Sequence, residues 1–216
     1  MPIFKTMVSV AALAASLTFT SSAVSAAVVD FDVDGLGAPI AANTPITNQY
    51  ANLGVLFEGL EDGAAVDINA APDPDGDPEP STPNVLTNCS SASTSCPGNR
   101  ADIVRISFAS AVSQVSLMLN TLGSSPVTFE LYDDSNALLE TLTQASASGT
   151  YELVSFAATG IFRIDGLQPN DGWAWAMDDL TFTPSAPVPV PASLLLLGTA
   201  LVGLGAASSR RRRRTV

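Results

Sequence analysis

Residues 112–120 read Val-Ser-Gln-Val-Ser-Leu-Met-Leu-Asn, and apolar and polar side chains largely alternate along them. In an extended chain successive side chains point to opposite faces, so Val115, Leu117 and Leu119 would share one face. This period of two predicts a strand with one buried and one solvent-facing side. Similar runs, separated by turn-forming residues, occur at residues 28–33, 55–58, 64–68, 103–108, 127–132, 138–143, 150–156, 160–164 and 175–182.

These runs amount to about ten strands, and no segment between them has the periodicity of an amphipathic helix. A parallel α/β sheet needs helices between its strands, which excludes that class. The sequence therefore predicts an all-β fold, an antiparallel β-sandwich or jelly roll, over residues 27–184. Residues 70–100 are rich in Pro, Asp, Ser and Thr and predict a long acidic surface loop with a short strand at 84–87.

The chain is strongly acidic. Its 216 residues include 21 Asp and Glu against nine Lys and Arg, for a net charge of −12. Most of the basic residues lie at the chain ends, so residues 27–186 hold three arginines and a net charge of −18. Such a domain repels nucleic acid, which we do not expect as a partner. The acidity either keeps an exported protein soluble or attracts divalent cations and basic partners.

The first 26 residues predict a secretory signal peptide. Lys5 supplies a positive charge, an apolar run follows, and Val24-Ser25-Ala26 places small residues before a cleavage point after Ala26. The expected partners are the Sec translocon and signal peptidase. The alternative, an N-terminal membrane anchor, fits less well because the apolar run is short for a span.

Two cysteines, Cys89 and Cys96, remain in the predicted exported part. An oxidising compartment permits a disulfide between them, which would close a small loop rather than brace the domain. A metal site is poorly supported because the chain has no CxxC motif and no histidine. The missing histidine also excludes histidine-based catalytic triads.

Two groups of carboxylates are candidates for a structural Ca²⁺, a cation that prefers oxygen ligands. Asp73, Asp75 and Asp77 alternate in the acidic loop, although prolines stiffen it and the full calcium-loop spacing is missing; the alternative is a plain acidic loop. Asp32, in the first strand, and Asp178, in the last, would meet if the end strands pair. A carboxylate turned inward there needs a metal or, alternatively, hydrogen bonds from neighbouring amides.

Trp173 and Trp175 are two residues apart and share one face of a strand. Exposed together with Tyr50 or Tyr132, they would form a stacking platform for sugar rings; buried, they belong to the core. Paired carboxylates for glycoside hydrolysis remain a further alternative, although no spacing singles out a pair. The chain contains no GxSxG, P-loop or GxGxxG motif, so nothing points positively to an enzyme.

The C-terminal residues 185–216 have three parts: a proline motif at 187–191, an apolar helix predicted at 193–207, and a basic cluster at 210–214. The arginines should stay on the cytoplasmic side of the inner membrane and leave the domain outside. The tail is either a permanent single-span anchor or a transient one that is cut. Its key residues are Val188, Pro189, Val190 and Pro191 in the motif and Arg210, Arg211, Arg212, Arg213 and Arg214 in the cluster.

This three-part tail resembles the PEP-CTERM sorting signal of Gram-negative bacteria, with Val190 where the eponymous Glu usually stands. The resemblance implies recognition by an exosortase, removal of the tail, and release or attachment at the cell surface. Residues 50–57 and 175–182 are similar to β-rich domains common in that family, most of which have no known function. We therefore expect a non-catalytic, exported envelope or extracellular-matrix protein associated with exopolysaccharide. A carbohydrate-binding module and a secreted hydrolase are the alternatives.

Overall fold

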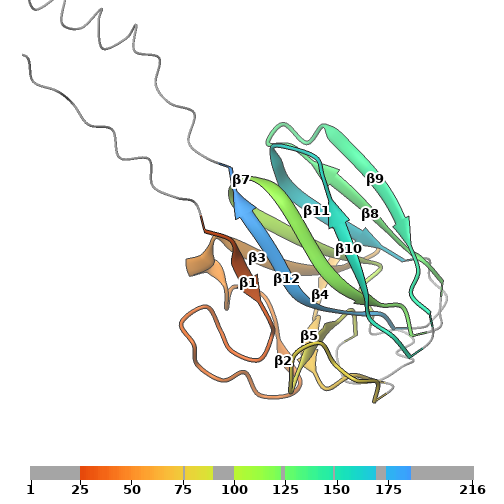
Figure 1. Ribbon diagram of the computed structural model, residues 1–216. Coiled ribbons are helices and arrows are strands. Elements are labelled where there is room, and N and C mark those ends of the chain that lie inside the picture. The colour runs from red at the N-terminus through yellow and green to blue at the C-terminus, as the bar shows by residue number, and fades with distance from the viewer. Residues whose placement is uncertain are drawn as a thin grey trace, which may run out of the picture.

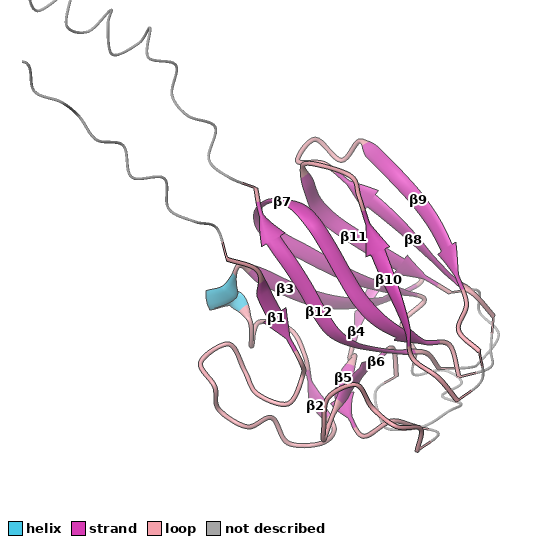
Figure 2. Ribbon diagram, viewed as in Figure 1, coloured by secondary structure: helices cyan, strands magenta, loops and turns pink. Residues whose placement is uncertain are grey.

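The computed structural model describes residues 25–74, 76–89, 100–122, 125–147, 149–168 and 174–185. The described chain is all-β and antiparallel, with a single turn of 3-10 helix at Ala51–Leu53 (Figure 2). The strands form two layers, as predicted for a β-sandwich (Figure 1). Helices that could span a membrane are not found among the described residues, and the predicted signal peptide core and sorting tail lie outside them.

One long strand, β7 (Ile103–Asn120), holds the two layers together. Residues 103–108 pair with β3 and β11 in the first sheet, and residues 112–120 pair with β12 and β10 in the second. Buried side chains alternate along both halves, and the alternation slips between Val112 and Val115, where the pairing with β12 also shifts register. The sequence predicted two strands at this place. The two predicted strands form one strand because residues 109–111 between them are also extended.

The first sheet runs in the order β4, β3, β7, β11, β8, β9. Its strands other than β7 are β3 (Val55–Glu61), β4 (Ala64–Val66), β8 (Val127–Tyr132), β9 (Leu138–Gln144) and β11 (Ile161–Leu167).

The second sheet runs in the order β10, β7, β12, β6, β5, β2. Along one edge of β12, β6 pairs with residues 176–177 and β1 pairs with residues 180–182. Its strands other than β7 are β1 (Ala27–Val29), β2 (Thr44–Pro45), β5 (Asn69–Ala71), β6 (Val85–Thr87), β10 (Glu152–Phe156) and β12 (Ala176–Pro184).

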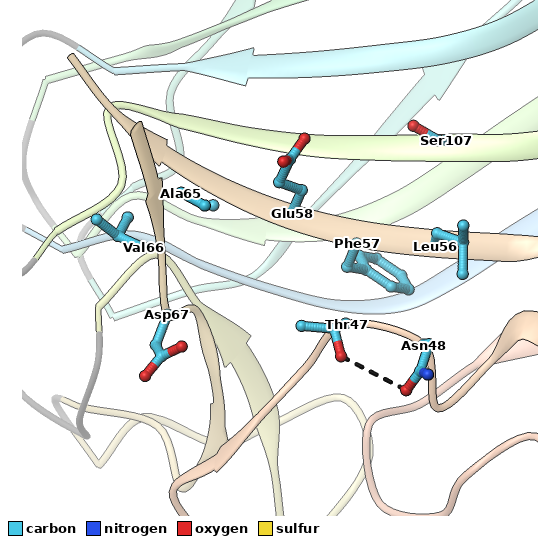
Figure 3. A pocket seen from close by; sticks show the side chains of 10 residues that line it. Thr47, Asn48, Leu56, Phe57, Glu58, Ala65, Val66, Asp67 and Ser107 are labelled. Atoms are coloured by element: carbon cyan, nitrogen blue, oxygen red, sulfur yellow. Dashed lines mark hydrogen bonds between the residues drawn. The ribbon is translucent and has the colours of Figure 1, made fainter. Parts of the chain in front are cut away.

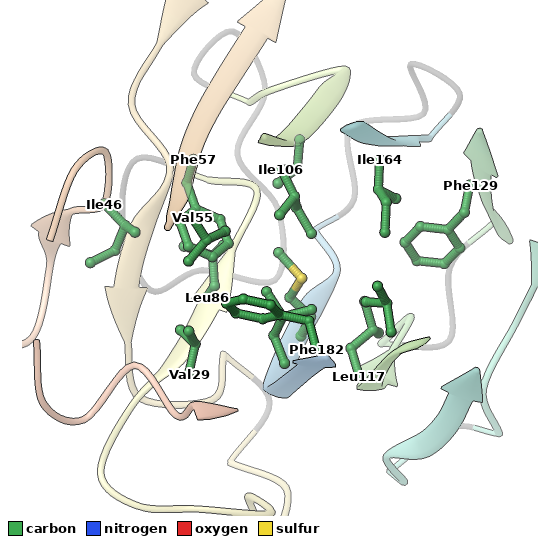
Figure 4. Packing of buried hydrophobic residues seen from close by; sticks show 14 of the residues in the cluster. Val29, Ile46, Val55, Phe57, Leu86, Ile106, Leu117, Phe129, Ile164 and Phe182 are labelled. Carbon is green, nitrogen blue, oxygen red and sulfur yellow. The ribbon is translucent and has the colours of Figure 1, made fainter. Parts of the chain in front are cut away.

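A large apolar core lies between the layers (Figure 4), and Cys89, Leu122 and Ala174 form a second, small cluster. Phe129 of the first sheet meets Phe156 of the second with ring centroids 5.3 Å apart, and Phe108 meets Phe182 at 5.1 Å. The Phe129–Phe156 pair is edge to face and the Phe108–Phe182 pair is tilted; aromatic pairs at such distances add about 0.5–1.5 kcal/mol each beyond the burial of their area. Val115, Leu117 and Leu119, which the alternating pattern placed on one face, are buried in this core.

Two parts of the chain differ from the predictions. The first strand ends at Val29 rather than at residue 33, because Phe31 has a positive φ of 59° and the Asp30 carboxylate accepts hydrogen bonds from two backbone N–H groups after it. The acidic segment is not one long surface loop. Its first residues form β5, a buried strand that was not predicted, whereas β6 confirms the short strand predicted at residues 84–87, where Val85 and Leu86 complete the core beside β12.

Candidate functional site

A cleft with a volume of about 560 Å³ lies at the β3–β4 side of the first sheet (Figure 3). Its floor is the outward face of β3, where Leu56 and Glu58 are 46% and 48% exposed. The end of β4 forms one wall, and a loop that carries Thr47 and Asn48 forms another (Figure 3). The lining residues are Thr47, Asn48, Leu56, Phe57, Glu58, Gly59, Ala65, Val66, Asp67 and Ser107.

Gly59 permits the tight packing of the β4 wall on the floor. A Cβ atom at this position would lie 2.6 Å from the Ile68 side chain and 2.7 Å from the Val66 carbonyl oxygen. No other residue leaves room for that approach without a backbone shift. The wall is therefore set by a glycine in the middle of β3.

Hydrogen bonds fasten the opposite wall. The Phe57 backbone N–H donates to the Thr47 carbonyl oxygen over 2.9 Å, which ties the loop to the edge of β3. Within the loop, Gln49 accepts from the Thr47 N–H and donates to the Pro45 carbonyl oxygen, both over 2.7 Å. The cleft is thus pre-formed, and the side chains of Thr47 and Asn48 remain exposed at its rim.

A charged row continues from the cleft across the outer face of the first sheet. Glu58 lies beside Arg105, and Arg105 lies beside Asp165 on β11. Arg105 donates two hydrogen bonds to Asp165, of 2.9 and 3.0 Å, and its third nitrogen lies 3.7 Å from Glu58. This bidentate pairing raises the pKa of Arg105 and holds Asp165 at 4% exposure.

On the same face of the first sheet, Arg163 packs on the aromatic ring of Tyr132. The Arg163 guanidinium carbon lies 4.0 Å from the centroid of the Tyr132 ring, and Arg163 Nε lies 3.3 Å from an Asp165 oxygen. The Tyr132 hydroxyl donates to Glu130, and this hydrogen bond raises the pKa of the phenol. The guanidinium covers one face of the ring, as expected for a cation–π contact.

The cleft can hold a small polar ligand. Hydroxyl, amide and carboxylate groups surround the apolar side chain of Leu56, a combination that offers hydrogen-bond donors and acceptors about a hydrophobic patch. The only aromatic residue that lines it, Phe57, has its ring in the core, so a ligand would be held by hydrogen bonds rather than by stacking.

The end strands do pair, and they bring Asp178 to the place that the sequence predicted. Asp178 is 0% exposed and accepts hydrogen bonds from the Ser81 N–H at 2.9 Å, the Ser81 hydroxyl, and the Asp179 N–H at 2.8 Å. Backbone amides therefore bind this carboxylate, as in the alternative that the sequence offered to a metal site. Burial nevertheless raises the pKa of Asp178 to about 7. Asp32 accepts instead from the Asn84 N–H over 2.7 Å.

The predicted calcium ligands of the acidic loop are likewise engaged by protein donors. Asp73 accepts from the Tyr151 hydroxyl at 2.5 Å and from the Asp77 N–H at 3.0 Å, and Asp77 accepts from the Asn120 side chain at 3.0 Å. Asp75 lies outside the described residues. Within the described ranges, no three Asp, Glu or Cys side chains are grouped so as to hold a metal ion.

The tryptophan platform is corrected by the structure. Trp175 is 1% exposed and packs edge to face on Phe129, with Gly166 against its ring, so it belongs to the core and cannot stack on a sugar at the surface. Tyr50 is also buried, while Tyr132 reaches the surface beneath Arg163. Trp173 lies outside the described residues.

Cys89 is buried and disulfide-bonded, in keeping with the predicted bridge, whose other residue, Cys96, is not described. Ala26 is exposed just before β1. Val24, the motif residues 188–191 and the arginines 210–214 lie outside the described residues.

The residues of the outer face were missed by the sequence analysis. Arg105 and Arg163 are two of the three arginines between residues 27 and 186, and each stands in a strand that the sequence did predict. The alternation of side chains along those strands could have predicted that both arginines lie on the outward face, opposite the buried side chains. The pairing of β3, β7, β11 and β8 that brings them together was not, because it joins residues far apart in the chain.

Comparisons with known proteins leave the function open. No family model matches the chain, and no curated protein sequence matches it. Among solved structures, a family 29 carbohydrate-binding module from Piromyces equi is similar with a TM-score of 0.42 and 10% identity over 80% of this chain and 98% of that one. An adhesin domain of Lys-gingipain from Porphyromonas gingivalis gives a TM-score of 0.40 and 11% identity over 67% and 100%. These likenesses are too distant to carry an argument about what this chain binds.

Proposed function

We propose that this chain is a non-catalytic, exported surface protein that binds a saccharide in the cleft on β3. The observation that supports the proposal is the pre-formed cleft itself, in which hydroxyl, amide and carboxylate groups surround Leu56. Sugar hydroxyls both donate and accept hydrogen bonds, and the faces of sugar rings carry C–H groups that pack on apolar side chains. A cleft of about 560 Å³ is in the range of small-ligand sites.

The outer face beyond the cleft would extend the binding surface. Ser107 borders both the cleft and Arg163, so a longer chain that leaves the cleft along this row would meet Arg163 and Tyr132. The exposed groups of these residues suit hydroxyl-rich ligands. We therefore place the start of a polysaccharide in the cleft and its continuation across the first sheet.

Titration calorimetry with a panel of soluble polysaccharides tests the proposal. Leu56→Ala should weaken binding at least about fivefold, because it removes an apolar side chain that lines the cleft. Leu153→Ala is the control, since Leu153 is also an exposed leucine but lies on β10 in the second sheet, away from the proposed surface. No binding by the unaltered protein, or equal losses in both variants, would contradict a saccharide site in this cleft.

For delivery, we propose that the signal peptide exports the chain and that an exosortase removes the tail at the motif of residues 188–191. The tail would anchor the protein in the inner membrane until it is cut, with extracellular polysaccharide as the later partner. The intact mass of the surface protein decides between cleavage and a permanent anchor. A mass that still includes Arg210 to Arg214 rules out cleavage. Cleavage that is unchanged in a host without an exosortase rules out the exosortase as the protease.

The hydrolase alternative has one specific observation in its favour, since Glu58 and Asp67 are two carboxylates that line one cleft. Glycoside hydrolysis uses such a pair as acid and base or nucleophile. Release of reducing sugar from a bound polysaccharide, lost in Glu58→Gln, would establish it. We expect binding without release.

A further inference from the structure

We infer that the cleft on β3 selects saccharides that carry ammonium groups, such as deacetylated amino sugars, over neutral ones, and rejects uronates. This inference rests on the proposed saccharide site and names its ligand class. It follows from the charges that face the cleft, which all have the same sign. Among the described lining residues, the ionisable side chains are Glu58 and Asp67, and none is basic.

Asp67 is available to a ligand. Its side chain is exposed at the end of β4, and within the described part of the chain it takes part in no hydrogen bond or ion pair. Figure 3 shows its carboxylate on the same side of β3 as the loop of Thr47 and Asn48. A hydrogen bond from an ammonium to this carboxylate is charge-assisted, and such bonds are about twice as strong as those between neutral groups.

Glu58 is only partly satisfied by the protein. Its nearest cation is Arg105, at 3.7 Å, and two other nitrogens of that guanidinium are already bonded to Asp165. The Glu58 side chain keeps 48% of its surface exposed, so it can accept a second cation. Arg105 in turn is committed to two carboxylates and offers no free positive charge to an anionic ligand.

The surroundings of the cleft strengthen this preference. Beyond the cleft floor, β3 ends at Glu61 and the turn after it begins with Asp62, whose N–H contacts the Asp102 carboxylate over 3.4 Å. The chain between residues 27 and 186 contains no lysine and carries a net charge of −18. The summed field of such a domain attracts cations and repels anions before contact. Because the cleft offers no aromatic ring for stacking, charge-assisted hydrogen bonds should dominate its affinity.

Three tetrasaccharides of equal length test the inference with the full chain: glucosamine, N-acetylglucosamine and galacturonate oligomers. At pH 5.5 ordinary Asp and Glu side chains are ionised and the amino sugar is protonated. We expect the glucosamine oligomer to bind about 5–20-fold more tightly than the acetylated one, and the galacturonate oligomer not to bind. The preference should shrink as added salt screens the charges.

Charge-removing variants locate the effect. Glu58→Gln and Asp67→Asn should each weaken binding of the glucosamine oligomer about 3–10-fold and leave the acetylated oligomer within about twofold. Asp134→Asn removes the same charge from an exposed turn after β8 and should change neither. Equal affinity for the charged and neutral oligomers overturns the inference and leaves the saccharide site standing. A loss in Asp134→Asn as large as in Glu58→Gln overturns it too, because the general field would then suffice. If none of the oligomers nor any polysaccharide of the panel binds, both proposals fail.

Discussion

Replacing Asp165 by Asn should destabilise the protein more than any other single charge removal on the outer face. Asp165 is nearly buried beneath two guanidiniums, with Arg105 at 2.9 and 3.0 Å and Arg163 at 3.3 Å. The substitution keeps the shape of the side chain but leaves two positive groups close together without their shared anion. Removal of one partner from a buried ion pair costs about 3–5 kcal/mol.

The expected loss is smaller than that range because water reaches both arginines. Their side chains are 27% and 22% exposed, so their repulsion is screened, and we expect the free energy of unfolding to fall by about 2–3 kcal/mol. In a domain of this size that corresponds to a melting temperature lower by about 4–12 °C.

Urea unfolding followed by circular dichroism measures this loss, with Asp134→Asn as the surface control. Combined with Arg105→Met in a double-mutant cycle, Asp165→Asn should show a coupling of at least about 1 kcal/mol. A loss below about 0.5 kcal/mol, or a coupling near zero, would refute the view that the charged row is a stabilising network.

Two further predictions concern buried groups. Burial raises the pKa of Asp178 to about 7, so the folded protein binds a proton more readily than the unfolded chain. The contribution of Asp178 to the free energy of unfolding should be fully present below about pH 4 and be lost as pH rises from about 4 to about 7. Asp178→Asn should remove most of this fall between about pH 4 and 7 in urea titrations, with a remainder from Asp32 and Asp179, whose pKa values burial also raises; an unchanged fall would count against the assignment. In a Trp173→Phe variant the fluorescence of Trp175 should resist quenching by acrylamide, because the ring is in the core, and quenching as strong as that of free tryptophan would disprove its burial.

The fold class was predictable because the alternation of side chains is a local property. The run at residues 127–132 became β8 with the same bounds, and the inward set Val115, Leu117 and Leu119 is buried as the period of two requires. The division of β7 between two sheets was not predictable, since it depends on which distant strands pair with each half. Local patterns predict a strand and its buried face but not its neighbours.

The inward position of Asp178 was predictable from the sequence, but its hydrogen-bond partner Ser81 was not. Two adjacent aspartates in a regular strand put one side chain inward, and Asp178 is that residue. However, β12 is not regular there, because its pairing with β7 slips between Asp178 and Thr181, and Asp179 takes a positive φ of 48° at the bulge. The bulge turns the carboxylate toward Ser81, 97 residues earlier, so its partner is an amide and a hydroxyl that no sequence spacing indicates.

The pairing of β1 with β12 also bears on the proposed export and sorting. Ala27 is the register partner of Phe182, so the described domain begins and ends at neighbouring positions of one sheet. The proposed cuts, after Ala26 and within residues 188–191, both fall outside these strands, and Ser185 already holds the end of β12 in place by donating to the Ala111 carbonyl oxygen at 2.7 Å. Removal of either segment therefore breaks no strand pairing of the described domain. The cleft and the charged row, which belong to the first sheet, should therefore be the same before and after the proposed processing.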